Sequence, residues 1–232
     1  MTMNLGKGHA VSLGAGYEWR APQAATAFAA PAQVEPSVQQ QYPDIQVPVV
    51  TVPGNPDATA AINIEIEKNI AAFISQTDEC YKDNEDWNKV YMGNSYTVTC
   101  NDDSVLSIVL TKYINVEHAA HPMRYIHGLN FNPQTGEKIV AFDLKEFSAE
   151  KYGKDIYTSE LLTNKLAKKA AENDGLIIFD GILPLSSLPE QFYFDADRHV
   201  HFLFQLYEIA PYVCGVIDVD MDTESDDYLM YR

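Results

Sequence analysis

The chain has 232 residues, of which 46% are apolar and 21% are charged, with 16 basic side chains against 33 acidic ones. The resulting formal net charge of −17 argues against binding to nucleic acid or to an anionic membrane surface, because both need Lys and Arg to neutralise phosphate. A cationic partner is compatible with this charge. No window approaches the roughly 18 apolar residues of a membrane-spanning helix, so no membrane span is predicted.

The first 42 residues differ from the rest because Gly, Ala, Pro and Gln dominate them. The run from Ala21 to Gln41 has few bulky apolar side chains to offset the entropy cost of ordering. We therefore predict that residues 1–42 are a leader and low-complexity tether. Small residues around Phe28 are typical of an export-signal cleavage region, but the basic and long apolar segments that precede one are missing. A truncated export signal and a plain Ala/Pro tether are the alternatives.

The ordered part is predicted to open with a strand and a long helix. Alternating apolar residues predict the strand over Ile45–Thr51, and Pro48 places it at a sheet edge because proline lacks a backbone donor. Asn55–Asp57 supply turn and capping chemistry before a near-helical apolar run from about Ala60 to Thr77. The polar, acidic segment Asp78–Asn94 is interpreted as a surface excursion.

The remaining sequence alternates between strand pairs and one more helix. Period-two apolar patterns separated by turn residues predict hairpins, and a Leu-rich stripe predicts a helix from about Tyr157 to Glu172. Strands are predicted over residues 96–100, 105–112, 123–131, 137–144, 175–182, 191–194, 199–206 and 215–222. The fold class that follows is α+β, with an antiparallel sheet built from hairpins and packed by two main helices.

Five of the six histidines are clustered in the sequence, at positions 118, 121, 127, 199 and 201. His199 and His201 would project from one face of a strand, and a zinc site needs three or four N, S or O ligands. No H-E-x-x-H motif or zinc-finger spacing accompanies them. His118, His121, His199 and His201 are therefore weak metal candidates. Structural or surface histidines are favoured over the alternative, a metal-dependent enzyme.

The acidic C-terminal segment begins with Asp218, Asp220 and Asp222, in the D-x-D spacing of a calcium loop. An EF-hand loop needs Gly at its sixth position and Glu at its twelfth, where this sequence has Thr223 and Leu229. Strand alternation instead places the three aspartates on one face. We interpret that face as solvated.

The three cysteines are Cys80, Cys100 and Cys214. In an exported protein, a disulfide between Cys80 and Cys100 would close a loop of about 20 residues and contribute on the order of 3 kcal/mol. Buried free thiols are an equal alternative. Cys214 lies in an apolar context that is typical of a core position.

Catalytic chemistry has little support in the sequence. It has no G-x-S-x-G motif, and no spacing marks one pair of carboxylates among the 33 acidic residues. We predict no catalytic residue, no enzyme activity and no cofactor. The aromatic-rich C-terminal third is mostly expected to be core, but Tyr207 and Tyr212 flank a proline corner where they could contribute to a binding groove.

Several segments, in order along the chain, resemble a known family. They are YPDIQVPVVTVPGNPDATAAINIEIEKNI, then DDSVLSIVLTKY followed by AAHP, then NFNPQTGEKIVAFDL, and finally FYFDADRHVHFLFQLYEIAPYVCGVIDV. This set resembles the paired domains of unknown function found in RsiV-like, lysozyme-sensing anti-sigma factors and at the N-terminus of PdaC-type peptidoglycan deacetylases. The resemblance covers about residues 43–222 and divides them into a PdaC-N-terminal-like subdomain, 43–112, and an RsiV C-terminal-like subdomain, 113–232.

The resemblance implies a non-catalytic domain in the periplasm or cell envelope of a bacterium. Its expected partner is a lysozyme-like cationic protein or peptidoglycan, and the alternative is an accessory module of a peptidoglycan-modifying enzyme. The segments that resemble the family make His121, Tyr207 and Tyr212 the partner-binding candidates. The family's usual N-F-D is Asn130-Phe131-Asn132 here, which argues against a carboxylate role at that turn.

Overall fold

The fold is that of a computed structural model, which describes residues 30–82, 90–172 and 176–223. Within these ranges the chain forms three antiparallel sheets and three α-helices, which confirms the α+β class and the hairpin-built sheets. No helix in the described part of the chain is long and apolar enough to cross a membrane.

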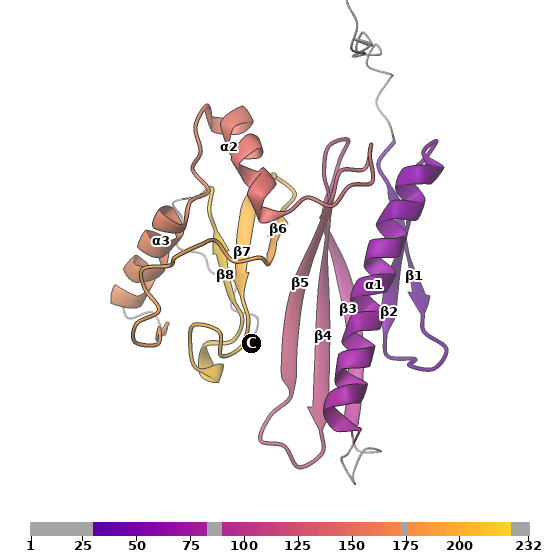
Figure 1. The fold of residues 1–232 in the computed structure, drawn as a ribbon, viewed down its shortest axis with the longest axis horizontal. Coiled ribbons are helices and arrows are strands. Elements are labelled where there is room, and N and C mark those ends of the chain that lie inside the picture. The colour runs from indigo at the N-terminus through magenta and orange to yellow at the C-terminus, as the bar shows by residue number, and fades with distance from the viewer. Residues whose placement is uncertain (1–29, 83–89, 173–175, 224–232) are drawn as a thin grey trace, which may run out of the picture.

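The first half of the fold packs one long helix against two sheets (Figure 1). The strands are β1 (Gln33–Val38), β2 (Gln46–Thr51), β3 (Val90–Asn101), β4 (Leu106–Val116) and β5 (Met123–Phe131), with α1 (Pro56–Tyr81) between β2 and β3 in the sequence. β1 pairs with β2, and the second sheet has the order β3-β4-β5. The Asn55 side chain caps α1 by accepting the amide of Ala58. The helix then buries a stripe that includes Ile62, Ile66 and Ile70 against β2 and the β3-β4-β5 sheet.

The end of the segment predicted as a tether forms β1. Directly before β1, the backbone N–H and C=O of Ala32 both bond the side chain of Asn101, at 3.2 and 2.8 Å. The two-stranded sheet pairs Pro36 with Pro48. Because both strands of such a sheet are edges, the edge position predicted from Pro48 is confirmed. Residues 1–29 of the predicted leader lie outside the described residues.

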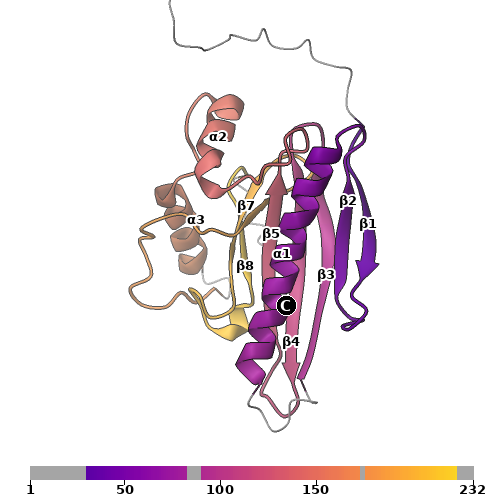
Figure 2. The same ribbon diagram turned by 45° about the vertical axis from the view of Figure 1, so that its right-hand side comes forward.

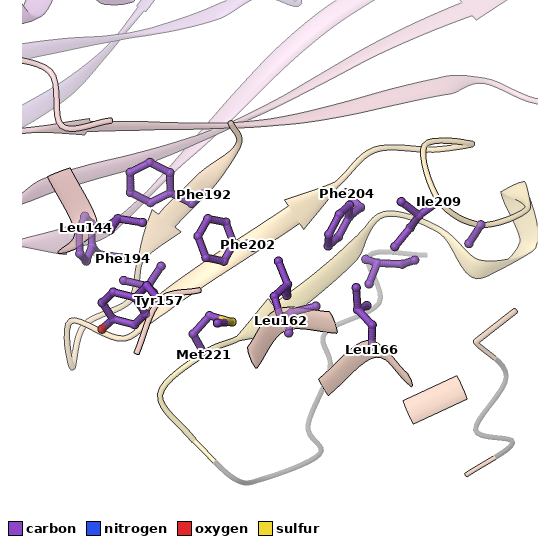
Figure 3. Packing of buried hydrophobic residues seen from close by; sticks show 14 of the residues in the cluster. Leu144, Tyr157, Leu162, Leu166, Phe192, Phe194, Phe202, Phe204, Ile209 and Met221 are labelled. Carbon is purple, nitrogen blue, oxygen red and sulfur yellow. The ribbon is translucent and has the colours of Figure 1, made fainter. Parts of the chain in front are cut away.

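The second half packs two shorter helices on one face of a small sheet (Figures 1 and 2). The elements are α2 (Leu144–Tyr152), α3 (Ser159–Ala171), β6 (Phe192–Phe194), β7 (Val200–Phe204) and β8 (Ile217–Asp220), with 3-10 turns η2 (Ala141–Asp143) and η3 (Tyr212–Cys214). The core under the helices is rich in aromatic rings, with Phe192, Phe202 and Phe204 from the sheet facing Leu162 and Leu166 of α3 (Figure 3).

Two predicted strands are wrong. Residues 137–144 were expected to complete a hairpin with β5, but they form only a bridge at Lys138 before η2 and α2. The Asp143 carboxylate accepts the N–H of Val140 at 2.8 Å, so the backbone begins to coil there instead of extending. Residues 176–182 contain no strand, and Gly181 adopts a left-handed φ of 81°. α1 continues to Tyr81, into the segment expected to be a surface excursion.

The two halves meet along β5 and β6. The buried Ser107 hydroxyl donates to Asn130 at 2.7 Å and accepts the amide of Phe194 at 3.1 Å, and Asn130 donates to the carbonyl of Phe192 at 2.8 Å. A Cβ on Gly128 would lie 1.8 Å from that same carbonyl oxygen, so only glycine allows this approach. The joint also buries Val109, Ile126, Tyr193, Leu203 and Val216. The predicted subdomain boundary after residue 112 lies within β4, and the division into subdomains stays a prediction.

Candidate functional site: an exposed groove and a buried His/Asp network

The three residues predicted to bind a partner come together in space. His121 lies in the β4–β5 connection, whereas Tyr207 and Tyr212 lie between β7 and β8. The His121 Nε2 is 3.0 Å from the Tyr207 hydroxyl, and its ring stacks on Tyr212 with centroids 3.6 Å apart and planes 21° apart. The Tyr212 hydroxyl donates to the carbonyl of Pro122 at 3.1 Å. The three rings therefore form one cluster that joins the two connections.

The Tyr207 backbone is held in a conformation that side chains rarely adopt. Its φ is 65°, in the left-handed region, while its side chain remains 49% exposed. The turn around it is fixed because Gln205 bonds the backbone N–H and C=O of Ile126 in β5, both at 2.9 Å. Backbone strain at an exposed aromatic residue is typical of a functional position.

An open groove of about 550 Å³ lies beside this aromatic cluster. Its lining comes from β4, the start of β5 and the β7–β8 connection: Thr111, Tyr113, Asn115, Pro122, Met123, Arg124, Leu206, Tyr212, Val213 and Gly215. Most of this surface is apolar, and the Val213 side chain is 74% exposed. Exposed apolar side chains that gather at a concave surface are typical of a binding site.

The sequence did not single out the part of the groove that β4 contributes. Tyr113 and Asn115 alternate along β4, which continues to Val116 beyond the strand predicted over 105–112, and nothing in the pattern shows which face of that strand meets the second half of the chain. Val213 lies between Tyr212, a partner-binding candidate, and Cys214, which was expected to be core, and it is exposed on the η3 turn.

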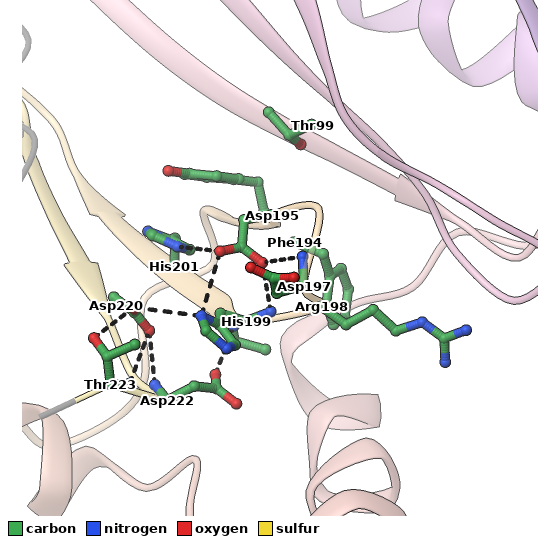
Figure 4. A network of polar contacts seen from close by, with 12 residues as sticks. Thr99, Phe194, Asp195, Asp197, Arg198, His199, His201, Asp220, Asp222 and Thr223 are labelled. Atoms are coloured by element: carbon green, nitrogen blue, oxygen red, sulfur yellow. Dashed lines mark hydrogen bonds and ion pairs between the residues drawn. The ribbon is translucent and has the colours of Figure 1, made fainter.

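The histidines predicted as weak metal candidates fall into two separate places. His118 is in the β4–β5 connection, with a side chain 77% exposed and 3.6 Å from Glu117. His199 and His201 lie at the β6–β7 turn and on β7, in a network with aspartates (Figure 4). In the described part of the chain, no group of three or more His, Cys, Asp or Glu side chains is arranged to hold a metal ion.

The network around His201 is an ion-pair cluster. The His201 Nδ1 is 2.8 Å from Asp218, and its Nε2 is 3.5 Å from Asp195 (Figure 4). His199 Nδ1 lies 3.3 Å from Asp195 and 3.6 Å from Asp220. Burial alone lowers the pKa of His201, but the bond to Asp218 and the charges of the neighbouring aspartates outweigh it, and the net effect raises the pKa.

The predicted solvated acidic face is wrong, because these aspartates are covered. Asp218 is 1% exposed and accepts the Tyr193 hydroxyl at 2.7 Å. The Asp222 side chain, also 1% exposed, accepts the Tyr157 hydroxyl at 2.8 Å and pairs with Lys151 at 2.9 Å. Each of these carboxylates accepts hydrogen bonds from hydroxyl or cationic donors. Such bonds offset the free-energy cost of burying a charge.

None of the three cysteines forms a disulfide among the described residues. Cys80 is exposed on α1, whereas Cys100 is buried in the core of the second half, so the disulfide considered from the sequence is absent from this structure. Burial, followed by the charge of Asp102, raises the pKa of the Cys100 thiol to about 12. Cys214 is buried, as its sequence context predicted.

Asn130 matches the first position of the family's usual N-F-D pattern and Asn132 replaces its aspartate, and both side chains make structural hydrogen bonds. Asn130 belongs to the joint between the halves. Asn132 accepts the amides of Gln134 and Thr135, at 2.8 and 3.3 Å, and so shapes the turn after β5. An aspartate could make the same two bonds.

Comparisons with known proteins agree with this architecture. The family model described as Deacetylase PdaC matches residues 37–124, and the model described as Protein of unknown function (DUF3298) matches residues 145–224. A solved member of the DUF3298 family from Bacteroides fragilis is 14% identical, with a TM-score of 0.50, and the match covers 84% of this chain and 91% of that one. A DUF3298 family protein from Pseudomonas aeruginosa is also 14% identical over the same shares, with a TM-score of 0.48.

No curated protein matches the chain. At 14% identity the solved structure from Bacteroides fragilis supports the fold alone, whereas the two family models match the two halves separately and in the same order as the resemblance seen in the sequence. The chain therefore pairs a region that matches the PdaC model with a region that matches the DUF3298 model, which is the pairing that the resemblance predicted.

Proposed function

We propose that this chain is a non-catalytic, extracytoplasmic binding domain that recognises a lysozyme-like cationic protein of the cell envelope through the groove beside His121, Tyr207 and Tyr212. The observation that carries the proposal is the convergence of these three side chains, from two distant connections, at the rim of an exposed apolar groove. The match to the PdaC model supports the location outside the cytoplasm.

The groove has the properties of a preorganised protein-binding surface. Its aromatic rim is already locked by a stack and by hydrogen bonds, so little side-chain entropy is left to lose when a partner binds. Tyrosines at the centre of an interface contribute large contact areas, and Val213 offers an exposed apolar contact beside them.

The charge of the chain favours a cationic partner over a neutral one. A net charge of −17 creates a field that steers basic proteins toward the surface and speeds their association. Steering of this kind weakens as salt increases, because the screening length shortens. A lysozyme-like protein fits both the charge and the apolar groove.

A second candidate function is that of an accessory module for a peptidoglycan-modifying enzyme. The match of residues 37–124 to a model described as Deacetylase PdaC favours it. In that case the aromatic rim would stack on sugar rings and position a glycan for another domain or chain. The same groove would serve, but the ligand would be neutral or anionic.

Calorimetric titration separates the two functions. The full chain is titrated with a C-type lysozyme at low salt and, separately, with soluble peptidoglycan fragments. We expect saturable heat with lysozyme that weakens as salt is added. Saturable heat with the fragments alone would replace the first function with the second, and no heat with either ligand would contradict both.

A further inference from the structure

The groove proposed to hold the partner has a cationic lining within an acidic chain. Among the described residues that line it, Arg124 is the one charged residue, and none is acidic. The chain as a whole has 33 acidic residues against 16 basic ones, so this lining departs from the overall composition. The uncharged polar residues of the lining, Thr111, Tyr113 and Asn115, all carry hydrogen-bond donors. The groove itself therefore suits an anionic group, although the field of the whole chain attracts cations.

The second half of the chain fixes the backbone on both sides of Arg124. Arg124 lies at the start of β5, the strand of its sheet that is nearest the second half (Figure 1). The Tyr212 hydroxyl donates to the carbonyl of Pro122 at 3.1 Å, two positions before Arg124. Gln205 bonds the N–H and C=O of Ile126, two positions after it, both at 2.9 Å. Arg124 is therefore held at the same joint that builds the groove.

The ring of Tyr113 leaves the β5 side of the groove uncovered. Tyr113 on β4 pairs with Gly93 of β3 on one side and with Arg124 of β5 on the other. A Cβ on Gly93 would collide with the Tyr113 ring, so the ring lies over that glycine. The ring therefore leans toward β3, away from Arg124. A group that enters the groove can reach the half-buried Arg124 side chain without displacing it.

An arginine in an apolar groove favours a carboxylate as its ligand. A partner seated on the groove takes the guanidinium out of water, which costs free energy unless an anion compensates for the lost hydration. A guanidinium has five N–H donors in a planar fork, and two of them match the two oxygens of a carboxylate. We propose that the groove recognises an acidic side chain of the partner, with Arg124 as the residue that binds its carboxylate.

The inference deepens the proposed function and rests on it for the identity of the partner. The net charge of −17 acts at long range and attracts a basic protein, whereas Arg124 acts at contact. A basic protein still carries carboxylates. A face without one would bury the Arg124 charge with no anion from the partner opposite it, so Arg124 selects which face of the partner enters the groove.

A small probe tests this preference without the partner. N-acetyl-glutamate amide is added to the full chain at constant ionic strength, and backbone amide shifts are followed by NMR. N-acetyl-glutamine amide is the uncharged probe of the same shape. We expect saturable shifts at residues 111–115, 122–126 and 212–215 with the glutamate probe and none with the glutamine probe. Equal shifts with both probes, shifts confined to other residues, or no shift with either would overturn the inference.

Two variants of matched charge show whether Arg124 is responsible. Arg124→Gln removes the cation but keeps hydrogen-bond donors, and it is expected to weaken binding of the glutamate probe about tenfold, as loss of a hydrogen bond to a charged group does. Lys145→Gln removes the same charge from an exposed position on α2 and should leave binding unchanged. Equal effects of the two variants would show that the probe responds only to net charge, which would overturn the inference.

Titration of a C-type lysozyme into the same two variants connects the inference to the proposed function. Both substitutions make the chain more negative, so the long-range field alone would strengthen lysozyme binding in both. We expect Arg124→Gln to bind lysozyme about tenfold more weakly than Lys145→Gln does. Equal affinities, with saturable binding by the parent chain, would overturn the inference and leave the groove as the binding site. A parent chain that does not bind lysozyme would contradict the proposed function, and the glutamate probe would still test the preference of the groove.

Discussion

The Nε2 atom of His121 lies 3.0 Å from the hydroxyl oxygen of Tyr207, although 86 positions separate the two residues in the sequence. This contact joins the β4–β5 connection of the PdaC half to the β7–β8 connection of the DUF3298 half. It also fixes the rim of the groove in which we place the partner. The groove therefore exists only when both halves are folded and joined.

The variant Tyr207→Gly should lose affinity for the partner while keeping most of its folding stability. Glycine adopts a φ of 65° without steric cost, so the relief of strain offsets part of the lost ring contacts, and we expect the free energy of unfolding to stay within about 1 kcal/mol. Lysozyme affinity should fall about tenfold or more, because an exposed aromatic anchor is lost. His118→Gly is the matched control, since His118 is exposed with a φ of 68° and lies outside the cluster of His121, Tyr207 and Tyr212 beside the groove. Chemical denaturation and calorimetry measure the two effects, and an unchanged affinity for Tyr207→Gly would contradict the groove assignment.

Gly128→Ala should break the joint between the halves. The new Cβ would meet the Phe192 carbonyl oxygen at 1.8 Å, so β5 and β6 must separate, and we expect a loss of at least about 3 kcal/mol in urea unfolding. Gly181→Ala changes a glycine with open space around it and a φ of 81°, so only the backbone strain of about 1 kcal/mol is expected there. Equal losses for the two variants would show that the close approach does not matter.

Lys112→Met should stabilise the chain. Lys112 is 3% exposed, and among the described residues its ammonium contacts the Asn69 side chain and carbonyl, at 2.5 and 3.3 Å, and the Phe73 ring. Burial lowers the pKa of Lys112 to about 8, which means that the charged form is disfavoured in the fold. Replacing it with Met should raise the unfolding free energy by about 1–3 kcal/mol near neutral pH. Lys68→Met, on the exposed face of α1, should change it by less than about 0.5 kcal/mol. A destabilised Lys112→Met variant would show that the bonds to Asn69 outweigh the burial cost.

His127 should make the fold sensitive to acid. Burial, with smaller contributions from Lys112 and Lys138, lowers the pKa of His127 from 6.5 to about 4. Because the unfolded chain binds the proton first, the stability contributed by neutral His127 is present above 6.5 and is lost as pH falls toward 4. His127→Leu should flatten the change in unfolding free energy between about pH 7.5 and about pH 5 by up to about 2 kcal/mol. An unaltered pH profile would contradict this account.

His201 should change the pH dependence of stability in the opposite direction to His127. Its pKa is raised by Asp218 and the surrounding aspartates in spite of burial, so its contribution is fully present below the unfolded pKa. That contribution is lost as pH rises through the folded pKa. His201→Asn should therefore reduce stability more at about pH 6 than at about pH 9. A larger loss at the higher pH would contradict the assignment.

The fold could be predicted from the sequence where local pattern and tertiary structure agree. The long helix, the 96–112 hairpin and the Phe-rich hairpin around Asp195–Arg198 all have strong periodicity and turn residues, and all three are present. The predictions of strands at 137–144 and 175–182 are wrong because a short apolar run does not by itself determine whether the backbone is extended. A single capping bond from Asp143 starts a helix in the first of them.

The candidate site was predicted only in part. The resemblance singled out His121, Tyr207 and Tyr212 as candidates. Tyr113 and Val213 lie in the same family-like segments, but no local pattern marks either of them as part of a groove. The acidic strand shows the opposite problem. Alternation placed Asp218, Asp220 and Asp222 on one face, but β8 ends at Asp220 and Asp222 lies beyond it. The pattern also could not show that Tyr193 covers Asp218, or that Tyr157 and Lys151 cover Asp222. Whether a strand face is buried depends on which distant element packs against that face, and the local sequence of the strand does not show this.

Calorimetric titration of a C-type lysozyme into Val213→Gln and Val140→Gln tests the central claim most directly. Both variants make the same change at exposed valines, but Val213 lines the groove and Val140 precedes η2 in the other part of the surface. The account predicts that the parent chain and Val140→Gln bind lysozyme alike, while Val213→Gln binds about tenfold more weakly. Equal affinities for all three chains would contradict recognition through the groove.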